Sequence, residues 1–416
     1  MPDRPLRVAF LNWRDTGHPE GGGSERYVEQ IATGLVERGC AVTFRCSRYA
    51  GSSARSLRDG IAYARAGGRL GVYPRTLLAL VWARLRGRGF DVVVDVQNGL
   101  PFFARLVAGC PVVVLVHHVH REQWPVATGP LTARFGWWIE SWLSPRLHRG
   151  CQYVTVSAVT RAELATLGVR REHIAVVHNG ADAAPVTTLP RERAPRLVVL
   201  GRLVPHKRVE DALRVLARLL PELPALRLWV VGDGWWRSRL VDEAERLGVA
   251  QAVDFLGYVS ERAKHDLLSR AWVMLAPSLK EGWGLMVVEA ALRGVPSVAY
   301  RNAGGLSESI LDDVTGLLVD DLDAMTGATR QLIQDGGLRD ALGSAGRHYV
   351  SRFDWQTSTV SFLRLLQLAA SGATPTDEGD EREHAAEHRT QHVIDLTDGH
   401  AADGRLTEGR VTHQWG

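Results

Sequence analysis

Short runs of apolar and β-branched residues alternate along this chain with longer segments whose apolar positions recur at helical spacing. Such alternation is typical of parallel βα units, in which each strand is followed by a helix. The expected strands are RVAFLNW, AVTFRC, DVVVDV, PVVVLVHH, YVTVS and IAVVHNG in the first half, and RLVVLGR, LRLWVVGDG, VDFLGYV, WVMLAPS and PSVAYR in the second. Because the plan occurs twice, the sequence predicts an α/β fold with two doubly wound, Rossmann-like domains facing a cleft at the carboxyl ends of their strands.

The two domains are expected to meet near residue 185, in a segment rich in proline and polar residues. This segment, Ala181–Pro195, fits a connection better than a core element. The predicted units are an N-terminal domain over 1–185, a C-terminal domain over 186–352, a last amphipathic helix over 353–370 that packs back toward the N-terminal domain, and an acidic, disordered tail over 371–416.

Composition narrows the class of protein. With 416 residues, 45% of them hydrophobic, the chain is large enough for two cores. Its net charge of +4 is mild and gives no reason to expect nucleic acid. The four cysteines form no CxxC pair, so neither zinc nor a disulfide framework is implied. Because the N-terminus has no apolar leader and no run of about eighteen apolar residues follows, we expect a cytoplasmic protein that is neither exported nor membrane-spanning.

The most informative segment is SLKEGWGLMVVE, which leaves a strand, turns through two glycines and enters a helix. Its carboxylates, Glu281 and Glu289, are expected about 10 Å apart from the rise of an α-helix, too far for a compact acid/base couple. That separation suits a grip on two parts of one ligand, such as a hexose and a ribose, with a phosphate between them at the helix N-terminus. The alternative is that Glu289 is a solvated helix residue and Glu281 an N-terminal charge.

A second segment, GRLVPHK, also follows an expected strand and places Arg202 and Lys207 at its carboxyl end. Arg202 can bind phosphate oxygens through its planar fork, and Lys207 can neutralise a leaving diphosphate. The alternative, that these two are ordinary solvated basic residues at the start of a helix, is disfavoured, because cations destabilise a helix N-terminus unless an anion is present. We therefore expect a polyhydroxylated, anionic ligand and no metal requirement.

The motifs GRLVPHK, VVGDG, FLGYVS, PSLKEGWGLMVVEA and AYRNAGGLSESI together resemble those of the family 4 retaining glycosyltransferases of GT-B fold. The resemblance covers nearly everything up to about residue 370 and is strongest in the C-terminal domain. It implies that Glu281 lies near the hydroxyls of the donor sugar, that Glu289 binds the ribose, and that Arg202 and Lys207 bind the diphosphate. It also implies a phosphate and sugar cradle around Gly282, Gly284 and Leu285, and a site for the base at Tyr258 and Val259.

The resemblance is looser in the N-terminal, acceptor-facing domain. There the loop EGGGSE follows the first strand and precedes a helix, with Ser24 expected as the helix N-cap. Three consecutive glycines exceed what a tight turn needs, so we favour a close approach of Gly22 and Gly23 to a ligand. In the resembled family this loop contacts the donor phosphate or the acceptor.

A histidine cluster, His117, His118 and His120, closes the strand PVVVLV. His117 best matches the family's active-site histidine, which contacts the primary hydroxyl of the donor sugar. The other two fit hydrogen-bonded residues at a strand end. A zinc site is disfavoured because alternation points His117 and His118 to opposite faces and we expect no acidic or thiolate ligand nearby.

Two further patterns have the form of metal sites. Asp321-Leu-Asp323 resembles an Asp-x-Asp motif for Mg²⁺, but it follows TGLLVD and is expected to cap a helix instead. In the tail His384, His388 and His392 recur every four residues, and no role is assigned to them because no core surrounds them.

The stretch RFGWWIESWLSPRLHRG suggests contact with a membrane. It places three tryptophans, Trp137, Trp138 and Trp142, among arginines, as in helices that lie on a lipid surface. Arginines also crowd an earlier stretch, at Arg55, Arg58, Arg65, Arg69, Arg75, Arg84, Arg86 and Arg88. We therefore expect peripheral contact with anionic lipid at the inner face of a membrane, unless the tryptophans pack in the core.

The expected protein is a retaining, metal-independent glycosyltransferase that moves a hexose from a UDP- or GDP-sugar to a hydroxyl acceptor, such as a cell-envelope glycan or lipid. Arg202 and Lys207 would stabilise the leaving diphosphate, whose oxygen takes the acceptor's proton, while Glu281 and His117 position the sugar. Two alternatives stay open: a GT-B sugar-nucleotide epimerase or hydrolase, and a binding protein without turnover. The sequence specifies neither the base, the sugar nor the acceptor.

Overall fold

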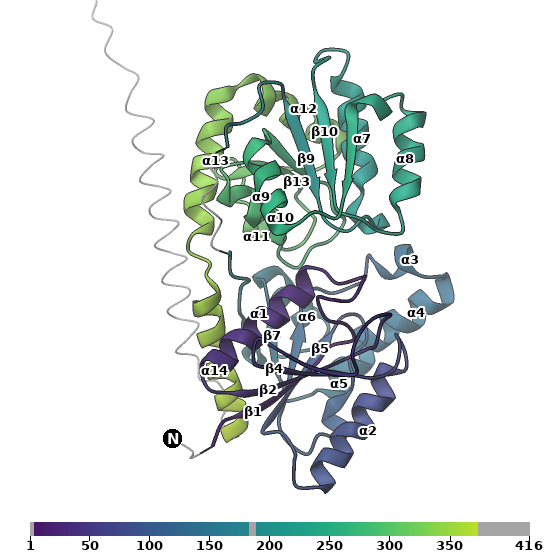
Figure 1. Cartoon of the computed structure of the whole chain (residues 1–416), viewed down its shortest axis with the longest axis vertical. Coiled ribbons are helices and arrows are strands. Elements are labelled where there is room, and N and C mark those ends of the chain that lie inside the picture. The colour runs from purple at the N-terminus through teal and green to yellow at the C-terminus, as the bar shows by residue number, and fades with distance from the viewer. Residues whose placement is uncertain (1–3, 183–188, 373–416) are drawn as a thin grey trace, which may run out of the picture. The chain divides into compact units, whose positions relative to one another are not determined.

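The computed structural model describes residues 4–182 and 189–372 and contains both predicted sheets (Figure 1). The first sheet has the strand order β3-β4-β2-β1-β5-β6-β7-β8 and is parallel apart from the β3–β4 pair. The second has the order β11-β10-β9-β12-β13-β14 and is wholly parallel. The first sheet and its helices form the N-terminal domain, and the second sheet and its helices form the C-terminal domain.

The N-terminal strands are β1 Arg7–Leu11, β2 Ala41–Cys46, β3 Arg55–Arg58, β4 Ile61–Arg65, β5 Val92–Gln97, β6 Val112–Val116, β7 Gln152–Thr155 and β8 Ile174–Val176. Those of the C-terminal domain are β9 Arg196–Leu200, β10 Arg227–Val231, β11 Val253–Gly257, β12 Val273–Ala276, β13 Ser297–Tyr300 and β14 Gly316–Val319.

The N-terminal helices are α1 Gly23–Glu37, α2 Val72–Leu85, η1 Ala104–Leu106, α3 Trp124–Ala127, α4 Pro130–Trp138, the π-helical turn η2 Ile139–Leu143, α5 Ser144–Leu147, α6 Ala158–Thr166 and η3 Arg171–His173. The later ones are η4 Pro205–Lys207, α7 Val209–Leu219, α8 Arg237–Arg246, η5 Ala250–Ala252, α9 Glu261–Arg270, α10 Leu285–Leu292, α11 Leu306–Ser309, α12 Leu322–Gln334, α13 Gly336–Val350 and α14 Trp355–Ser371.

Apolar helix faces cover both sides of the first sheet. Helices α1 and α14 pack together over one side, where the rings of Phe10 and Phe362 stack 6.1 Å apart (Figure 1). Helix α2 packs on the other side through Leu80. Successive side chains of a strand point to opposite faces of the sheet. Phe10 of β1 therefore packs in the apolar cluster beneath α1 and α14, and Ala9 packs in the cluster beneath α2. Burial on both faces explains why these strands are almost continuously apolar.

Three strands were not predicted: β3, β4 and β14. The β3–β4 hairpin pairs Arg58 with Ile61 across the two-residue loop Asp59-Gly60. Both loop residues have positive φ, 50° and 75°, which is the geometry that an Asp-Gly hairpin turn adopts. The hairpin therefore had a turn signal in the sequence, but its strands are short, and β3 carries the exposed arginines Arg55 and Arg58. Strand β14 is four residues long and follows the last expected strand.

Several predicted features fall outside the described residues. The expected interdomain connection includes residues 183–188, and the expected tail, with His384, His388 and His392, begins at 371 and is described only as far as 372. The predicted cap at Asp321 is confirmed: its carboxylate accepts a hydrogen bond from the Ala324 N–H at 2.8 Å, at the start of α12.

Candidate functional site

The glycine-rich loop after β1 lies against residues of the C-terminal domain. A Cβ atom on Gly22 would lie 3.2 Å from Arg202 Nε, and one on Gly23 would lie 3.3 Å from Leu285 Cδ1. Arg202 also donates a hydrogen bond to the Glu20 carbonyl at 3.0 Å. The structure therefore brings together two pairs of residues that the sequence places about 180 and 260 positions apart.

The start of helix α1 differs from the prediction. Gly22, not Ser24, is the N-cap residue, and its N–H donates to the Glu25 carboxylate at 2.8 Å. Ser24 lies inside the first helical turn, where its hydroxyl donates to Glu25 at 2.9 Å. Glu25 is fully buried, and the Arg14 guanidinium lies 2.8 Å from it. The predicted cap at Ser24 is wrong because a glutamate at the third helical position already satisfies the amide that starts the helix.

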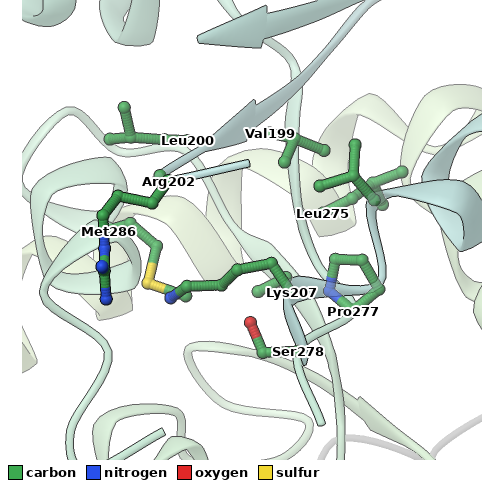
Figure 2. A pocket seen from close by; sticks show the side chains of 11 residues that line it. Val199, Leu200, Arg202, Lys207, Leu275, Pro277, Ser278 and Met286 are labelled. Atoms are coloured by element: carbon green, nitrogen blue, oxygen red, sulfur yellow. The ribbon is translucent and has the colours of Figure 1, made fainter. Parts of the chain in front are cut away.

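The predicted cations Arg202 and Lys207 line a small pocket at the carboxyl ends of β9 and β12, together with Ser278 and Met286 (Figure 2). Figure 2 shows Arg202 and Lys207 reaching this pocket from the loop after β9. Two cations at the carboxyl edge of a parallel sheet form a site suited to phosphate oxygens.

Lys207 is ion-paired with Glu281, and both side chains are largely buried. Burial alone would raise the pKa of Glu281, but the charge and hydrogen bond of Lys207, with a further hydrogen bond from Ser278, lower it below its ordinary value. The backbone of Glu281 is also fixed, because its N–H donates to the Ala303 carbonyl and its carbonyl accepts from Gly305 N–H, both at 2.9 Å. Glu281 is thus a rigidly held carboxylate that remains ionised.

The loop around Glu281 needs glycine. Gly282 packs against the N-terminal domain so closely that a Cβ atom would lie 2.3 Å from the His117 carbonyl oxygen. Gly284 has φ of +91° and is the N-cap of α10. A Cβ atom on Gly305 would lie 1.9 Å from the Gly282 carbonyl oxygen. Backbone segments therefore touch directly at this point, where α10 begins.

Glu289 lies on α10 and is held by cations of two other helices. Lys264 of α9 lies 2.6 Å from its carboxylate, and Arg26 of α1 lies 3.6 Å away. Burial raises the pKa of Glu289, and these two cations offset only part of that effect. Glu281 and Glu289 have separate basic partners, so they do not form one acid/base couple.

His117 follows β6 and is buried, with its ring 5.3 Å from the ring of Tyr27 in an edge-to-face contact. Burial lowers the pKa of His117 to about 4, so the imidazole is neutral at physiological pH. Its Nε2 atom has no hydrogen-bond partner among the described residues. A neutral imidazole with a free ring nitrogen can bind a sugar hydroxyl.

His118 and His120 lie together, with ring centroids 4.2 Å apart. An acidic residue is close to them after all, because Glu140 lies 2.9 Å from His120 Nδ1 and also accepts a hydrogen bond from Trp124 at 2.7 Å. The expectation that no acidic ligand is nearby is therefore wrong. Even so, no group of three or more His, Cys, Asp or Glu side chains with metal-binding geometry occurs in residues 4–182 and 189–372.

The remaining predicted residues lie after β11. Tyr258 is 88% exposed, whereas Val259 packs against the core of the C-terminal domain. The backbone here is joined to the loop after β10, since Gly232 N–H donates to the Gly257 carbonyl at 2.8 Å.

Comparison with known families covers both domains. A model described as Glycosyltransferase Family 4 matches residues 21–184, and one described as Glycosyl transferases group 1 matches residues 183–349. The chain belongs to glycosyltransferase family 4. The GT-B fold predicted for this family 4 member is confirmed by similar solved structures. One of them, the Anabaena HepE protein in complex with UDP-glucose, has a TM-score of 0.70 and 19% sequence identity. The match covers 87% of this chain and 99% of that one.

Curated relatives of this family 4 glycosyltransferase include two mycobacterial proteins. Glycogen synthase of Mycobacterium tuberculosis is 32% identical over 241 residues, which are 56% of this chain and 57% of that protein. A GDP-mannose-dependent α-(1-6)-phosphatidylinositol monomannoside mannosyltransferase of Mycolicibacterium smegmatis is 35% identical over 182 residues, 41% of this chain and 47% of that protein. The chain thus spans about half the length of these relatives.

Sequence reasoning missed four charged residues of this family 4 site: Arg14, Glu25, Arg26 and Lys264. The first three lie within or close to the glycine-rich loop, so their position in the sequence offered a signal. Lys264 offered none, because it lies on α9 and meets Glu289 only through helix packing.

Proposed function

We propose that this chain is a retaining, metal-independent glycosyltransferase that moves a hexose from a UDP- or GDP-sugar to a hydroxyl acceptor. The observation that carries the proposal is the buried Lys207–Glu281 pair beside Arg202, next to the glycine-rich loop of the other domain. Such a site offers cations for a diphosphate and a carboxylate for sugar hydroxyls within one pocket.

The proposed reaction exchanges one bond at the anomeric carbon for another on the same face of the sugar. The bond between this carbon and the diphosphate oxygen breaks, and a bond to the acceptor oxygen forms. The acceptor's proton passes to the departing diphosphate. Arg202 and Lys207 neutralise the charge that develops on the diphosphate, while Glu281 and neutral His117 hold the sugar hydroxyls.

The charges of the site support independence from metal. Arg202 and Lys207 line the pocket, and Arg14 lies beside Glu25 at the same loop. These cations can supply the positive charge that a divalent ion provides in other phosphoryl sites. Activity should therefore survive EDTA, and loss of activity that Mg²⁺ or Mn²⁺ restores would refute this part of the proposal.

The base of the proposed donor nucleotide is uracil or guanine. A solved structure of the same fold holds UDP-glucose, and one curated relative is named for GDP-mannose. A thermal-shift screen with UDP-, GDP- and ADP-sugars, each with and without EDTA, separates the bases, because a bound donor raises the melting temperature according to its affinity.

The decisive test measures release of nucleoside diphosphate with and without candidate acceptors, and NMR of the product then reports its anomeric configuration. A transferase releases the diphosphate only when an acceptor is present. Release without acceptor would identify the hydrolase alternative. Conversion of the donor sugar with little release would identify an epimerase, and binding without turnover would identify a non-catalytic protein.

We also propose a cytoplasmic protein whose acceptor belongs to the cell envelope, reached at the inner face of a membrane. None of the described helices is long and apolar enough to cross a bilayer. Two of the three tryptophans in the predicted lipid-binding stretch, Trp138 and Trp142, are 43% and 44% exposed, whereas Trp137 packs against the core. Exposed tryptophans support peripheral contact over complete burial.

A further inference from the structure

A helical stretch of the N-terminal domain exposes a row of large apolar side chains. Helix α4, the π-helical turn η2 and helix α5 follow one another without interruption over residues 130–147. Leu131, Phe135, Trp138 and Trp142 recur here at intervals of four, three and four residues, which places them on one face. Their exposed fractions are 82%, 61%, 43% and 44%. This face is therefore turned to solvent, although its residue types are those of a core.

The aromatic rings of this face form a continuous ridge. Phe135 stacks on Trp138 with centroids 5.8 Å apart, and Trp138 stacks on Trp142 at 5.4 Å. The guanidinium of Arg146 lies 4.2 Å from the Trp142 ring. Stacking holds the rings in place against one another, so little side-chain entropy is lost when they insert into another phase.

Helix α2 repeats the arrangement. Leu78, Trp82 and Leu85 recur at intervals of four and three residues and are 59%, 56% and 75% exposed. The guanidinium of Arg86 lies 5.1 Å from the Trp82 ring. On their inner sides both stretches pack against one apolar cluster, to which Leu80 of α2 and Trp137 of α4 belong. The two exposed rows thus cover the same side of the first sheet.

Charge completes the description of this surface. Residues 66–90 contain five arginines and no Asp or Glu. Residues 123–162 contain four arginines and a single acidic residue, Glu140, whose carboxylate is buried against His120 and Trp124. The two stretches therefore present apolar and cationic side chains with no exposed carboxylate of their own. This combination matches a surface that is apolar inside and anionic outside.

We propose that these two exposed rows, with their arginines, form a docking surface for an anionic lipid bilayer. We call it the aromatic–arginine surface and define it by Leu78, Trp82, Leu85, Arg86, Leu131, Phe135, Trp138, Trp142 and Arg146. The aromatic and leucine side chains enter the interface between headgroups and acyl chains, while the arginines contact lipid phosphates. This inference rests on the proposed function in one respect only: the proposed envelope acceptor is the substrate that the docked protein would reach.

The test is flotation of the full chain with vesicles, in the absence of donor and acceptor. We expect binding to phosphatidylcholine vesicles that contain about one third phosphatidylglycerol, weak binding to pure phosphatidylcholine, and loss of binding as salt rises from about 0.05 to about 0.5 M. Arg86→Glu/Arg146→Glu should weaken binding at least about tenfold, since each arginine near such a surface contributes about a fivefold factor. Trp138→Ser/Trp142→Ser should weaken it on every vesicle.

Matched controls lie in the C-terminal domain. Arg237 and Arg239 are exposed on α8 and each also lies over an aromatic ring, so Arg237→Glu/Arg239→Glu makes the same charge change. Trp235 is 64% exposed, so Trp235→Ser removes a ring that is even more exposed than Trp138 or Trp142. Both controls should bind vesicles as the unaltered chain does, and circular dichroism should show that every variant is folded.

Three results would overturn the proposal: equal binding to neutral and anionic vesicles, equal loss of binding in a control variant, or a self-associated chain that becomes monomeric when Trp138 and Trp142 are replaced. The last result would assign the surface to a second copy of the chain. A chain that floats but transfers no sugar would refute the proposed function alone, and a chain that transfers sugar to a soluble acceptor but never floats would refute this inference alone.

Discussion

The pair formed by Lys207 and Glu281 allows the structural and chemical roles of one contact to be separated. Lys207→Met keeps most of the side-chain volume and removes the ammonium group. The two side chains are only 17% and 13% exposed, so the Glu281 carboxylate would stay buried without its partner. Breaking a fully buried pair costs about 3–5 kcal/mol, and the small remaining exposure reduces the expected loss of unfolding free energy to about 2–4 kcal/mol.

The loss should depend on pH in a defined direction. In the unaltered chain the pKa of Glu281 lies below its ordinary value, so the pair stabilises the fold above pH 4–5, and this stabilisation is lost as pH falls through the lowered pKa. Without Lys207, burial raises the pKa of Glu281 above that of the unfolded chain. Protonation then relieves the cost, and Lys207→Met should be less destabilised at about pH 5 than at about pH 7.5.

Urea denaturation of Lys207→Met, Glu281→Gln and the double variant at both pH values checks this reasoning. The double variant should regain much of the lost stability, because no buried charge is left unpaired. Transfer activity should nevertheless stay at least about 100-fold below normal, as expected when a charge that stabilises the transition state is removed. Equal destabilisation of Lys207→Met at both pH values would refute the pairing argument, and full transfer by the double variant would refute the catalytic one.

Three further predictions concern His117, Glu289 and a pair of glycines. Burial lowers the pKa of His117 to about 4, so the unfolding free energy should fall as pH drops from about 6.5 toward about 4. In urea titrations His117→Asn should remove up to about 1.4 kcal/mol per pH unit of that fall. An unchanged pH dependence in this variant would contradict the assignment. Glu289→Gln should raise the donor KM about tenfold or more with little change in kcat, measured from initial rates, if the carboxylate binds the ribose equally in ground and transition states. Gly282→Ala should lower the unfolding free energy by about 1–3 kcal/mol, because its Cβ atom would meet the His117 carbonyl. Gly327→Ala should raise it by about 0.4–1 kcal/mol, because open space surrounds this position inside α12. In thermal denaturation the melting temperatures of the two variants should shift in opposite directions.

Hydrophobic periodicity predicted the strands that contain long apolar runs and missed the edge hairpin β3–β4 and the short strand β14, although β14 is buried at all four positions. Strand β5 is buried at every position, and its sequence, VVVDVQ, is almost continuously apolar. Strand β3 is exposed at three of its four positions and joins the sheet only at its edge, so its sequence, RSLR, lacks the apolar pattern of a core strand. Pattern reasoning detects long apolar runs, whereas an edge strand is defined by hydrogen bonds to its neighbour.

The charged residues of the site show the same limit. Arg202 and Glu281 could be predicted because each follows a strand, and the carboxyl ends of parallel strands meet at one edge of a sheet. The partners of Glu289 could not be predicted, because its contacts with Lys264 and Arg26 depend on how three helices pack. The tryptophans were undecided for the same reason, since the face of a helix that is buried depends on what lies beneath it.

The glycines of the site require a more specific explanation than freedom of the backbone near a ligand. In the loop EGGGSE, Gly21 makes the turn, since a Cβ atom there would lie 3.0–3.1 Å from the carbonyl oxygens of Asp15, Thr16 and His18, which precede it. Gly22 and Gly23 face Arg202 and Leu285 across the domain boundary instead. Gly282 likewise touches the His117 carbonyl of the other domain. Side chains at these three positions would separate the two domains at the point where their predicted donor residues meet. The glycine signature of this family 4 site therefore reflects close contact between domains as much as access for phosphate, and replacing these glycines should weaken donor binding even where no ligand atom is touched.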